Sequence, residues 1–318
     1  MLFNLDGSQK YERPSLVNGL DSLDIDGIAK YIKNGYSKKI IVLTGAGISV
    51  AAGIPDFRSP QIGLYSNVQE YHLPRPESVF EREYFLQNPK PFFSVSKRLL
   101  PGEFKPTPAH YFSVLLHKKG LLLKYYTQNI DDLDRRAGLE YPTLVECHGT
   151  YRTATCQKCH KKYNTNDIKN EILSDIIPKC DCGGIIQPDV VMYGDDLPEE
   201  FFDMLDRDFE KCDLLFVIGT SLKVEPFPSI IEDVPRETPR VLINNEPVVT
   251  YQEELKEING KLVDTSKDKM SQKFKFGHFF NRRDVFLGGD IQDNIIKLVH
   301  ALGWDDEFNE LLRKRPIE

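Results

Sequence analysis

The chain has 318 residues, of which 40% are apolar and 28% are charged, and its formal net charge is −7. That length holds one large domain or two smaller ones, and the negative charge argues against direct binding to nucleic acid or to anionic membranes. A basic partner, such as a lysine-rich peptide, suits this charge better. No apolar run approaches the roughly 20 residues of a membrane-spanning helix. The first residues do not resemble a secretory signal, so a cytoplasmic or nuclear location is expected.

The first part of the chain predicts an arm, a helix and a strand. Residues 1–20 contain many polar residues together with Gly and Pro, which predicts a flexible N-terminal arm. A short helix is expected over 25–36, with Gly35 near its end. The run Ile40–Thr44 is β-branched and aliphatic, which is typical of a buried parallel strand.

A glycine-rich turn follows this strand directly. Gly45 and Gly47 allow backbone angles that are closed to other residues, and they let a phosphate approach the chain. Ser49 and the small residues after it suit the first turn of a helix, whose unpaired N–H groups attract an anion. The turn is therefore a candidate dinucleotide site, although Gly45, Gly47 and Gly53 do not have the usual Gly-x-Gly-x-x-Gly spacing. A tight turn without a ligand is the alternative.

The continuation makes the pattern more specific. Gly53-Ile-Pro-Asp-Phe-Arg-Ser59 places an acid, an aromatic and a base after a proline, a cluster that an ordinary strand-to-helix turn does not need. Together with Gly45-Ala-Gly-Ile-Ser49, it resembles the signature of the sirtuins, the NAD-dependent protein deacylases.

Residues 60–120 alternate prolines with aromatic and aliphatic runs, which predicts short helices over 76–86, 90–100 and 108–119. Core packing alone explains this aromatic stripe. The resemblance adds that Gly63-Leu-Tyr65 belongs to a mobile cofactor loop. It also implies that the helices beyond this loop form a helical module inserted at about 66–120.

The remaining elements indicate an α/β fold. Apolar runs predict strands over 121–127, 144–148, 213–218 and 240–244, a helix begins at 128–132, and two helices close the chain over 290–302 and 304–315. Because these strands are continuously apolar rather than alternating, they favour a Rossmann-like, doubly wound parallel sheet. The expected units are a Rossmann-like domain of residues 21–150 and 189–303, a metal-binding module of 151–188, a surface insertion of 252–275 and a C-terminal helix within 304–318.

Four of the six cysteines cluster as Cys156-x-x-Cys159 and Cys180-x-Cys182. A disulfide framework does not suit an intracellular chain, whereas four thiolates suit structural, tetrahedral zinc. The family usually shows Cys-x-x-Cys twice, and the second pair here has one residue fewer. Two glycines after Cys182 allow the turn to adapt. Replacement of Cys182 by another zinc ligand is therefore the alternative.

Polar side chains follow several predicted strands at their carboxyl ends, where α/β sheets bind ligands. The sirtuin resemblance covers roughly residues 36–303. Its further matching segments are Thr127-Gln-Asn-Ile-Asp131, Glu146-Cys-His-Gly149, Gly219-Thr-Ser-Leu222, Val224-Glu-Pro-Phe227 and Ile243-Asn-Asn-Glu246. The variant of these motifs resembles the class that includes the cytosolic and nuclear deacetylases.

The resemblance implies a set of NAD-binding residues, which are Gly45, Ala46, Gly47, Ser49, Asp56, Phe57, Arg58, Tyr65, Gln128, Asn129, Ile130, Asp131, His148, Gly219, Thr220, Ser221, Asn244, Glu246 and Ile291. It implies that Asp131 and the backbone near Ile130 hold the nicotinamide amide. Gln128 would hold the ribose, and Asn129 would order a water or hydroxyl near the reacting carbon.

The same resemblance implies that His148 is the general base. A neutral imidazole has a pKa near 7, which suits removal of a proton from a ribose hydroxyl. A lone histidine at a strand end is more often structural, but its place before Gly149 in the family motif favours the catalytic role. Phe57 would cover the nicotinamide side, and Arg58 would contact phosphate. Glu246, at a strand end, would accept from ribose hydroxyls and repel a 2′-phosphate, which favours NAD over NADP.

An acylated-lysine protein or peptide is the substrate that the resemblance implies. Its acyl chain would contact Phe57 and Val191, and its backbone would pair with Tyr193 and Gly194 on one side. Val224 and Glu225 would pair with it on the other side. No Tyr-x-x-Arg pair occurs in residues 66–76, so acetyl or longer neutral acyl groups are expected rather than acidic ones.

The resemblance thus implies NAD-dependent deacetylation of protein lysines. Protein mono-ADP-ribosyl transfer from the same cofactor site is one alternative, and a non-catalytic NAD- or peptide-binding module is another. The intact set of Gln128, Asn129, Asp131 and His148 speaks against the last of these. The sequence leaves the oligomeric state and the target protein open.

Overall fold

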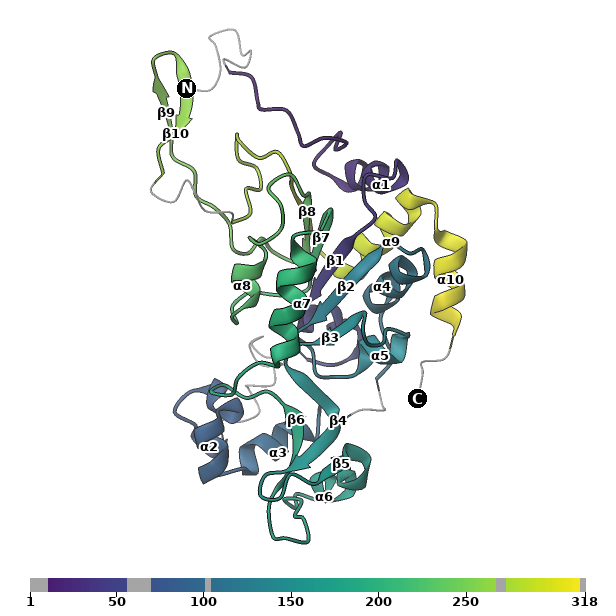
Figure 1. The fold of residues 1–318 in the computed structure, drawn as a ribbon, viewed down its shortest axis with the longest axis vertical. Helices are drawn as coiled ribbons and strands as arrows, with labels where there is room; N and C mark the ends of the chain where they lie inside the picture. The colour runs from purple at the N-terminus through teal and green to yellow at the C-terminus, as the bar shows by residue number, and fades with distance from the viewer. Residues whose placement is uncertain (1–10, 56–69, 101–103, 267–272, 315–318) are drawn as a thin grey trace.

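The computed structural model describes residues 11–55, 70–100, 104–266 and 273–314 (Figure 1). Its main feature is a six-stranded sheet in the order β11-β8-β7-β1-β2-β3, in which every neighbouring pair is parallel. The strands are β1 (Ile40–Thr44), β2 (Leu122–Thr127), β3 (Leu144–Glu146), β7 (Leu214–Ile218), β8 (Arg240–Asn244) and β11 (Asp284–Gly288). From β1 the chain extends the sheet first to one side and then to the other. The predicted doubly wound, Rossmann-like sheet is therefore confirmed.

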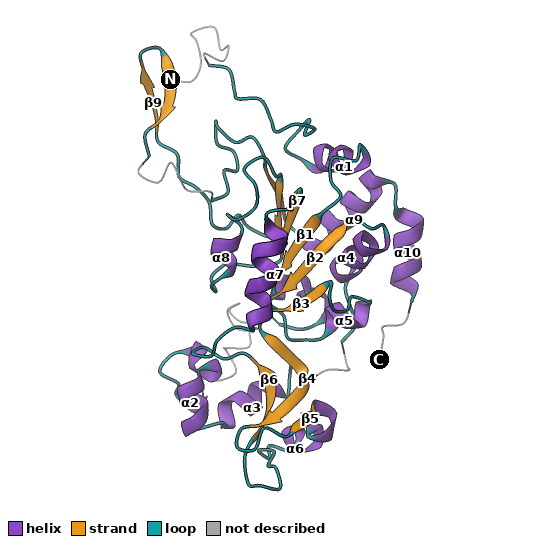
Figure 2. Cartoon of the chain, viewed as in Figure 1, coloured by secondary structure: helices purple, strands orange, loops and turns teal. Residues whose placement is uncertain are grey.

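Helices cover both faces of this sheet (Figure 2). One face carries α1 (Ile25–Lys33), α4 (Pro108–Lys118), α9 (Ile291–Leu302) and α10 (Asp305–Arg313), and the other carries α7 (Glu199–Phe209) and α8 (Phe227–Ile230). Successive strand residues point to opposite faces, so Ile40 and Val42 pack in the first core while Ile41 and Leu43 pack in the second. Burial on both faces explains why the strand is apolar from Ile40 to Leu43.

A second domain lies beyond the carboxyl ends of the strands, below the sheet in Figure 1. It combines the antiparallel sheet β5-β4-β6 with short helices. Its elements are η4 (Pro76–Phe80), α2 (Arg82–Gln87), α3 (Lys90–Ser96), β4 (Gly149–Cys156), β5 (Lys162–Asn164), η5 (Thr165–Asp167), α6 (Lys169–Leu173) and β6 (Ile186–Val190). Phe92 packs edge-on against Phe85 and lies 6.4 Å from the ring of Tyr151. The helical and cysteine-containing insertions therefore share one core.

Several local predictions differ from the structure. The helix expected to begin at 128–132 starts later, as α5 (Leu133–Ala137), and Asp132 before it has a φ of 66°. The expected arm of residues 1–20 joins the body before its end, because Val17 and Leu20 are buried. The 252–275 insertion contains a hairpin of β9 (Leu255–Ile258) and β10 (Lys261–Asp264). None of the helices in the described ranges has the length and apolar character needed to cross a membrane.

Candidate active site and metal centre

The loops that follow β1 and β7 meet where the direction of the sheet connections reverses. The Gly45 N–H donates to the carbonyl of Ile218 at 3.1 Å, and the Gly47 N–H donates to the carbonyl of Gly219 at 2.8 Å. A Cβ atom on Gly47 would lie 2.8 Å from the Cα of Gly219, so a larger residue would push the loops apart. Glycine at these positions therefore lets two backbones touch on the floor of a crevice.

The segment after this contact forms short 3₁₀ turns and does not continue as a longer helix. Ala46–Ile48 and Val50–Ala52 form two 3₁₀ turns, η1 and η2, and Gly53 follows them with a φ of 94°. The Ser49 N–H donates to a carbonyl within the first turn. The sequence predicts the first turn of a helix from Ser49 onward, and the structure has a single helical turn there, of the tighter 3₁₀ type.

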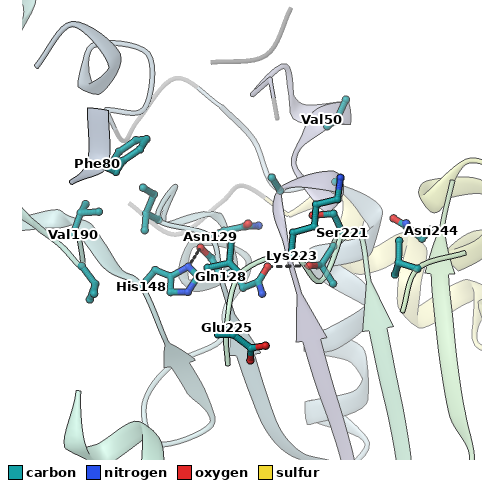
Figure 3. Close-up of a pocket in the computed structure, with 18 of the residues that line it drawn as sticks. Val50, Phe80, Gln128, Asn129, His148, Val190, Ser221, Lys223, Glu225 and Asn244 are labelled. Carbon is teal, nitrogen blue, oxygen red and sulfur yellow. Dashed lines mark hydrogen bonds between the residues drawn. The ribbon is translucent and has the colours of Figure 1, made fainter. Parts of the chain in front are cut away.

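A cavity of about 970 Å³ opens at these strand ends, and the second domain forms its other wall (Figure 3). It gathers most of the residues that the sequence singled out. The predicted residues that line it are Ala46, Gly47, Gln128, Asn129, Ile130, His148, Val191, Tyr193, Gly194, Gly219, Thr220, Ser221, Val224, Glu225, Asn244, Glu246 and Ile291. A cavity between a nucleotide-type crevice and a second domain can hold two reactants side by side.

The other predicted site residues fall into two groups. Gly45, Ser49 and Asp131 lie behind the residues that line the cavity in the described part of the chain. Asp56, Phe57, Arg58 and Tyr65 lie outside the described residues. The structure therefore brings together the strand-end residues but does not describe the loop that carries the family's aromatic and basic residues.

His148 follows β3, and its ring centre lies 5.9 Å from that of Phe227. Its Nδ1 is 3.1 Å from the carbonyl oxygen of Gln128. A carbonyl only accepts, so Nδ1 carries the proton and Nε2 keeps its lone pair. Burial lowers the pKa of His148 below its ordinary value, against a smaller opposing effect of the Gln128 carbonyl. The imidazole is therefore neutral near pH 7 and can accept a proton at Nε2.

Only one of the two polar atoms of the Gln128 side-chain amide has a hydrogen-bond partner in the described residues. Its Oε1 accepts a hydrogen bond from Thr220 Oγ1 at 2.9 Å, which fixes the side chain beside the cavity. Its Nε2 is buried, and no group in the described residues accepts a hydrogen bond from it. Leaving a buried donor unsatisfied costs about 1–3 kcal/mol. A ligand hydroxyl would satisfy it, so this amide fits the ribose of NAD.

The side chains of Ser49 and Asp131 form a hydrogen bond beneath the residues that line the cavity. Ser49 Oγ donates to Asp131 Oδ2 at 2.6 Å, and the Leu133 N–H donates to Oδ1 at 3.0 Å. Burial raises the pKa of Asp131, and the neighbouring His110 opposes the shift. Asn129, which does line the cavity, donates from Nδ2 to the Gly45 carbonyl at 3.2 Å. This buried layer therefore fixes the residues above it.

Some lining residues were not predicted from the sequence. Phe80, Leu197, Val248 and Gln292 line the cavity. Gln292 fixes the loop after β1, because its Nε2 donates to the Ile48 carbonyl at 3.3 Å. Phe80 belongs to the aromatic stripe of residues 60–120, which core packing alone explains, and it is only 6% exposed. The sequence pattern therefore gives no signal that this residue lines a cavity. These residues could only have been found from the tertiary arrangement.

The expected peptide edge after β6 needs one correction. The Tyr193 N–H donates to the carbonyl of Phe80 at 2.8 Å, and the Tyr193 carbonyl accepts from the Arg82 N–H at 3.0 Å. The backbone of Tyr193 is thus paired within the chain. It does not offer the free edge to which a substrate backbone was expected to bind, although the residue lines the cavity.

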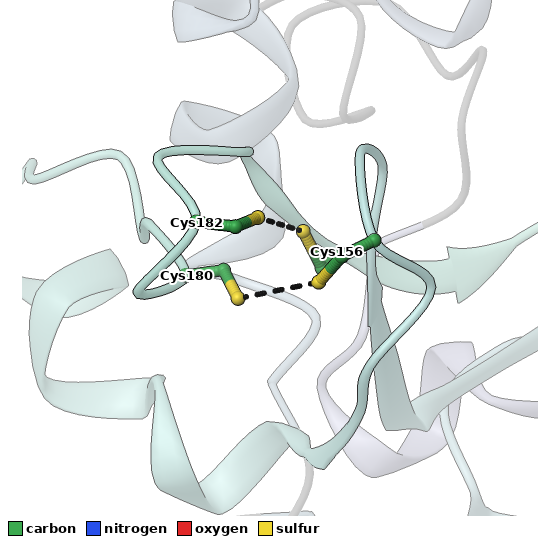
Figure 4. Close-up of side chains that lie close together, drawn as sticks. Cys156, Cys180 and Cys182 are labelled. Carbon is green, nitrogen blue, oxygen red and sulfur yellow. Dashed lines mark hydrogen bonds between the residues drawn. The ribbon is translucent and has the colours of Figure 1, made fainter.

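The four clustered cysteines converge in the second domain (Figure 4). Cys156 Sγ lies 3.5 Å from Cys182 Sγ, and Cys159 Sγ lies 3.6 Å from Cys180 Sγ. All four sulfur atoms lie within 4.8 Å of one another. Tetrahedral zinc–thiolate sites, with bonds of about 2.3 Å, bring sulfur atoms to such separations. The residues therefore fit a structural zinc ion, as the sequence predicted.

The shortened second cysteine pair reaches this cluster through a tight turn. Gly183 has a φ of 81°, and its N–H donates to the Cys180 carbonyl at 2.8 Å. A Cβ atom on Gly184 would lie 2.7 Å from Cys156 Sγ, so this position tolerates no side chain without moving a metal ligand. Cys182 stands in the cluster, and the alternative that another group replaces it finds no support in this geometry.

Comparison with known proteins agrees with this site. Residues 45–226 match the model of the Sir2 family. The NAD-dependent deacetylase sir2A of Dictyostelium discoideum is 48% identical over 293 residues, which cover 91% of this chain and 54% of that protein. The chain thus spans about half the length of sir2A.

The match covers a larger share of the length of two vertebrate relatives than of sir2A. The NAD-dependent protein deacetylase sirtuin-2 of Danio rerio is 45% identical over 302 residues, or 93% of this chain and 76% of that protein. The NAD-dependent protein deacetylase sirtuin-3 of Mus musculus is 41% identical over 91% of this chain and 79% of that protein. The family match covers more than half of the chain, and its bounds enclose the loops after β1 and β7 and the cysteine cluster. The chain therefore belongs to the Sir2 family.

Proposed function

We propose that this chain is an NAD-dependent protein-lysine deacetylase, which converts acetyl-lysine and NAD to lysine, nicotinamide and O-acetyl-ADP-ribose. The observation that carries the proposal is a neutral His148 beside a Gln128 amide that lacks an acceptor in the described residues. Membership of the Sir2 family supports it, as do the deacetylase names of the relatives. Neutral acyl groups longer than acetyl fall within the same proposal.

The chemistry is divided between cofactor and protein. NAD, when bound, supplies the ribose carbon that takes up the acyl oxygen as nicotinamide leaves. Gln128 Nε2 would donate to a ribose hydroxyl, and His148 Nε2 would accept the proton that this hydroxyl loses. Asn129 would order a water or hydroxyl near the reacting carbon. Val191, on the wall contributed by the second domain, would seat the acyl chain.

Other residues would fix the rest of the cofactor. Asn244 donates from Nδ2 to the carbonyl of Glu246 at 2.9 Å, which holds the segment after β8 at the cavity rim. The exposed Glu246 carboxylate would accept from ribose hydroxyls and repel a 2′-phosphate, so NAD is favoured over NADP. Ile291 would lie beside the adenine. The roles implied for Phe57 and Arg58 rest on the family motif.

The metal would be structural. Zinc held by Cys156, Cys159, Cys180 and Cys182 has four protein ligands, and a fully liganded zinc leaves no position for a catalytic water. The backbone N–H of Cys182 and the hydroxyl of Tyr163 lower the pKa of Cys180 to about 6, which favours the thiolate that zinc binds. Within this proposal, residues 21–150 and 189–303 form the NAD-binding unit, and residues 151–188 form the zinc module. The helices of residues 76–96 are an insertion into the first unit, and they pack with the zinc module in the second domain.

The cellular setting belongs to the same proposal. A net charge of −7 favours basic protein substrates over nucleic acid or membrane surfaces. We therefore include a cytoplasmic or nuclear location, where lysine-rich protein substrates occur.

The test is mass spectrometry of the products formed from NAD and a panel of acyl-lysine peptides. Deacetylated peptide together with O-acetyl-ADP-ribose is the expected result. Transfer of ADP-ribose from NAD to protein without loss of the acyl group would instead identify a mono-ADP-ribosyltransferase. Retention of both substrates unchanged would identify a non-catalytic binding module.

A further inference from the structure

The segment Met192–Asp195, here called the cleft segment, connects the second domain to the cavity. Val191 before it donates from its N–H to the carbonyl of His148 at 2.9 Å. The Asp195 N–H donates to the Met192 carbonyl at 2.9 Å, and Gly194 between them has a φ of 98°. The segment is therefore a tight turn anchored at one end beside the proposed base, and its residues line the cavity.

The other end of the turn is held by one guanidinium. Arg82, the first residue of α2, donates from Nε and Nη2 to the two oxygens of Asp195 at 2.7 and 2.5 Å. Its Nη1 donates to Oε1 of Gln187, on β6, at 2.7 Å. The Arg82 N–H also donates to the Tyr193 carbonyl at 3.0 Å. A single residue thus joins the helical part of the second domain, its sheet and the cleft segment.

The ion pair between Arg82 and Asp195 is a strong interaction at the cleft segment. A bidentate guanidinium–carboxylate pair combines charge with a fixed orientation. Burial acts to raise the pKa of Asp195, but the hydrogen bonds from Arg82 and from the Met192 N–H outweigh it, and the pKa is lowered. The Met192 N–H donates to Asp195 Oδ2 at 3.1 Å, so the same carboxylate also closes the turn. Losing the Arg82 side chain would therefore free the Asp195 carboxylate from α2 and β6 and loosen the turn, while the backbone hydrogen bonds of Tyr193 and Asp195 remain.

A purely structural role for this pair explains the observations less well. The second domain already has a core of buried aromatics, such as Phe85 and Phe92. The Arg82 and Asp195 side chains remain 25% and 24% exposed, so solvent partly screens the ion pair. The effect of the pair falls on the cleft segment, where peptide would bind.

We propose that Arg82 is a positioning residue that sets affinity for the acyl-peptide by fixing the cleft segment, and this rests on the proposed deacetylase function. Arg82 acts on the substrate site indirectly, through its hydrogen bonds to Asp195 and Tyr193. None of its described hydrogen bonds is to the proposed base or to the loops of the cofactor crevice. Its loss therefore changes the KM for peptide rather than the KM for NAD. Conformational freedom gained by the cleft segment must be lost again whenever peptide binds.

The first test compares steady-state kinetics of Arg82→Met and Asp195→Asn with the wild type. Loss of a hydrogen-bonded charged pair predicts a peptide KM raised about tenfold in each variant, while kcat and the KM for NAD stay within about twofold. Arg82→Lys, which keeps the charge but not the bidentate geometry, restores part of the affinity. The double variant is no worse than either single one, because both remove one interaction.

The matched control is Lys97→Met. Lys97, at the end of α3, forms an ion pair with Asp175 at 2.5 Å within the second domain, and its side chain is 26% exposed, close to the value for Arg82. Its removal leaves the peptide KM unchanged. An equal rise in peptide KM for Lys97→Met and Arg82→Met would overturn the proposal. So would a parallel rise in the KM for NAD, or a melting temperature in Arg82→Met low enough to explain the loss.

Hydrogen exchange separates this proposal from the deacetylase function. In Arg82→Met the amides of Met192 and Asp195 exchange faster than in the wild type, while amides of the central sheet do not change. This readout needs no substrate. If exchange in Arg82→Met is faster than in the wild type, as expected, but the wild-type chain never deacetylates peptide, the proposed function is overturned and the positioning by Arg82 is not. If the amides of Met192 and Asp195 exchange at the same rate in Arg82→Met and in the wild type, the proposal that Arg82 fixes the cleft segment is overturned.

Discussion

At the scale of single residues, the site depends on which atoms remain free. His148 donates from Nδ1 to the Gln128 carbonyl, so its Nε2 is left to accept a proton. Gln128 is fixed through Oε1 by Thr220, so its Nε2 is left to donate. The sequence predicts both residues by family resemblance, but it does not say which atom of each faces the ligand. Those assignments need the tertiary hydrogen bonds.

Replacement of His148 tests the proposed base directly. His148→Ala is expected to lower deacetylation on the order of 10²- to 10⁴-fold, the typical contribution of general acid–base catalysis. NAD affinity is expected to stay largely intact, because Gln128, Asn244 and Glu246 remain. Single-turnover kinetics and equilibrium NAD binding measure the two effects. Near-normal activity in a folded His148→Ala variant contradicts the assignment.

The lowered pKa of His148 predicts a pH dependence. A depressed pKa keeps the imidazole neutral to lower pH, so the base form persists below the ordinary value of 6.5. The acidic limb of kcat/KM for deacetylation should therefore lie below pH 6.5. The profile is measured across pH 5–8 with enzyme stability checked at each point. An acidic limb centred above 6.5 would show that the site raises this pKa instead.

Glu246 gives a prediction about cofactor choice. NAD is expected to be used in strong preference to NADP, because the carboxylate repels a 2′-phosphate. Glu246→Gln keeps the shape of the side chain and removes its charge, so it should narrow the preference and weaken NAD binding more than peptide binding. Kinetics with both cofactors provide the measurement. Equal turnover of NAD and NADP by the wild type would refute the ribose role.

At the scale of elements, the sequence predicts strands better than turns. The run Ile40–Thr44 is apolar at its first four positions and buried at all five, so its pattern and its environment agree. The small residues from Ala46 to Ala52 fit both an α-helix and 3₁₀ turns, and in the structure they form 3₁₀ turns, the first of which packs against Gly219 through Gly47. The shared core of Phe92 and Tyr151 joins segments far apart in sequence, so no local pattern reveals it.

The prediction at the scale of elements concerns the turn that holds Cys180 and Cys182. One tightly bound zinc per chain is expected, and Cys182→Ser and Cys180→Ser should each lose zinc and lower the melting temperature, because metal binding contributes to folding. Cys212→Ser is the control, since Cys212 is buried away from the cluster beside β7. Elemental analysis and thermal melting provide the readouts. Full zinc and wild-type melting in Cys182→Ser alone would exclude the four-thiolate site.

At the scale of the whole molecule, two domains complete one cavity. The parallel sheet supplies the crevice at its switch point, and β6 leads from the cysteine cluster to Val191 on the opposite wall. The sheet and its crevice follow from strand order and strand-end residues. The second wall does not, because it depends on how two distant insertions pack. Under the proposed function, we expect a zinc ion held by the four cysteines to support the reaction by keeping that wall in place.

The central claim is that this cavity couples cleavage of NAD to removal of an acetyl group from lysine. The most direct measurement counts nicotinamide released and lysine deacetylated in one reaction, with acetylated and unacetylated forms of the same peptide. One nicotinamide per deacetylated lysine, and no nicotinamide above background with the unacetylated peptide, is the predicted result. Equal nicotinamide release with both peptides, or deacetylation without NAD, would contradict it.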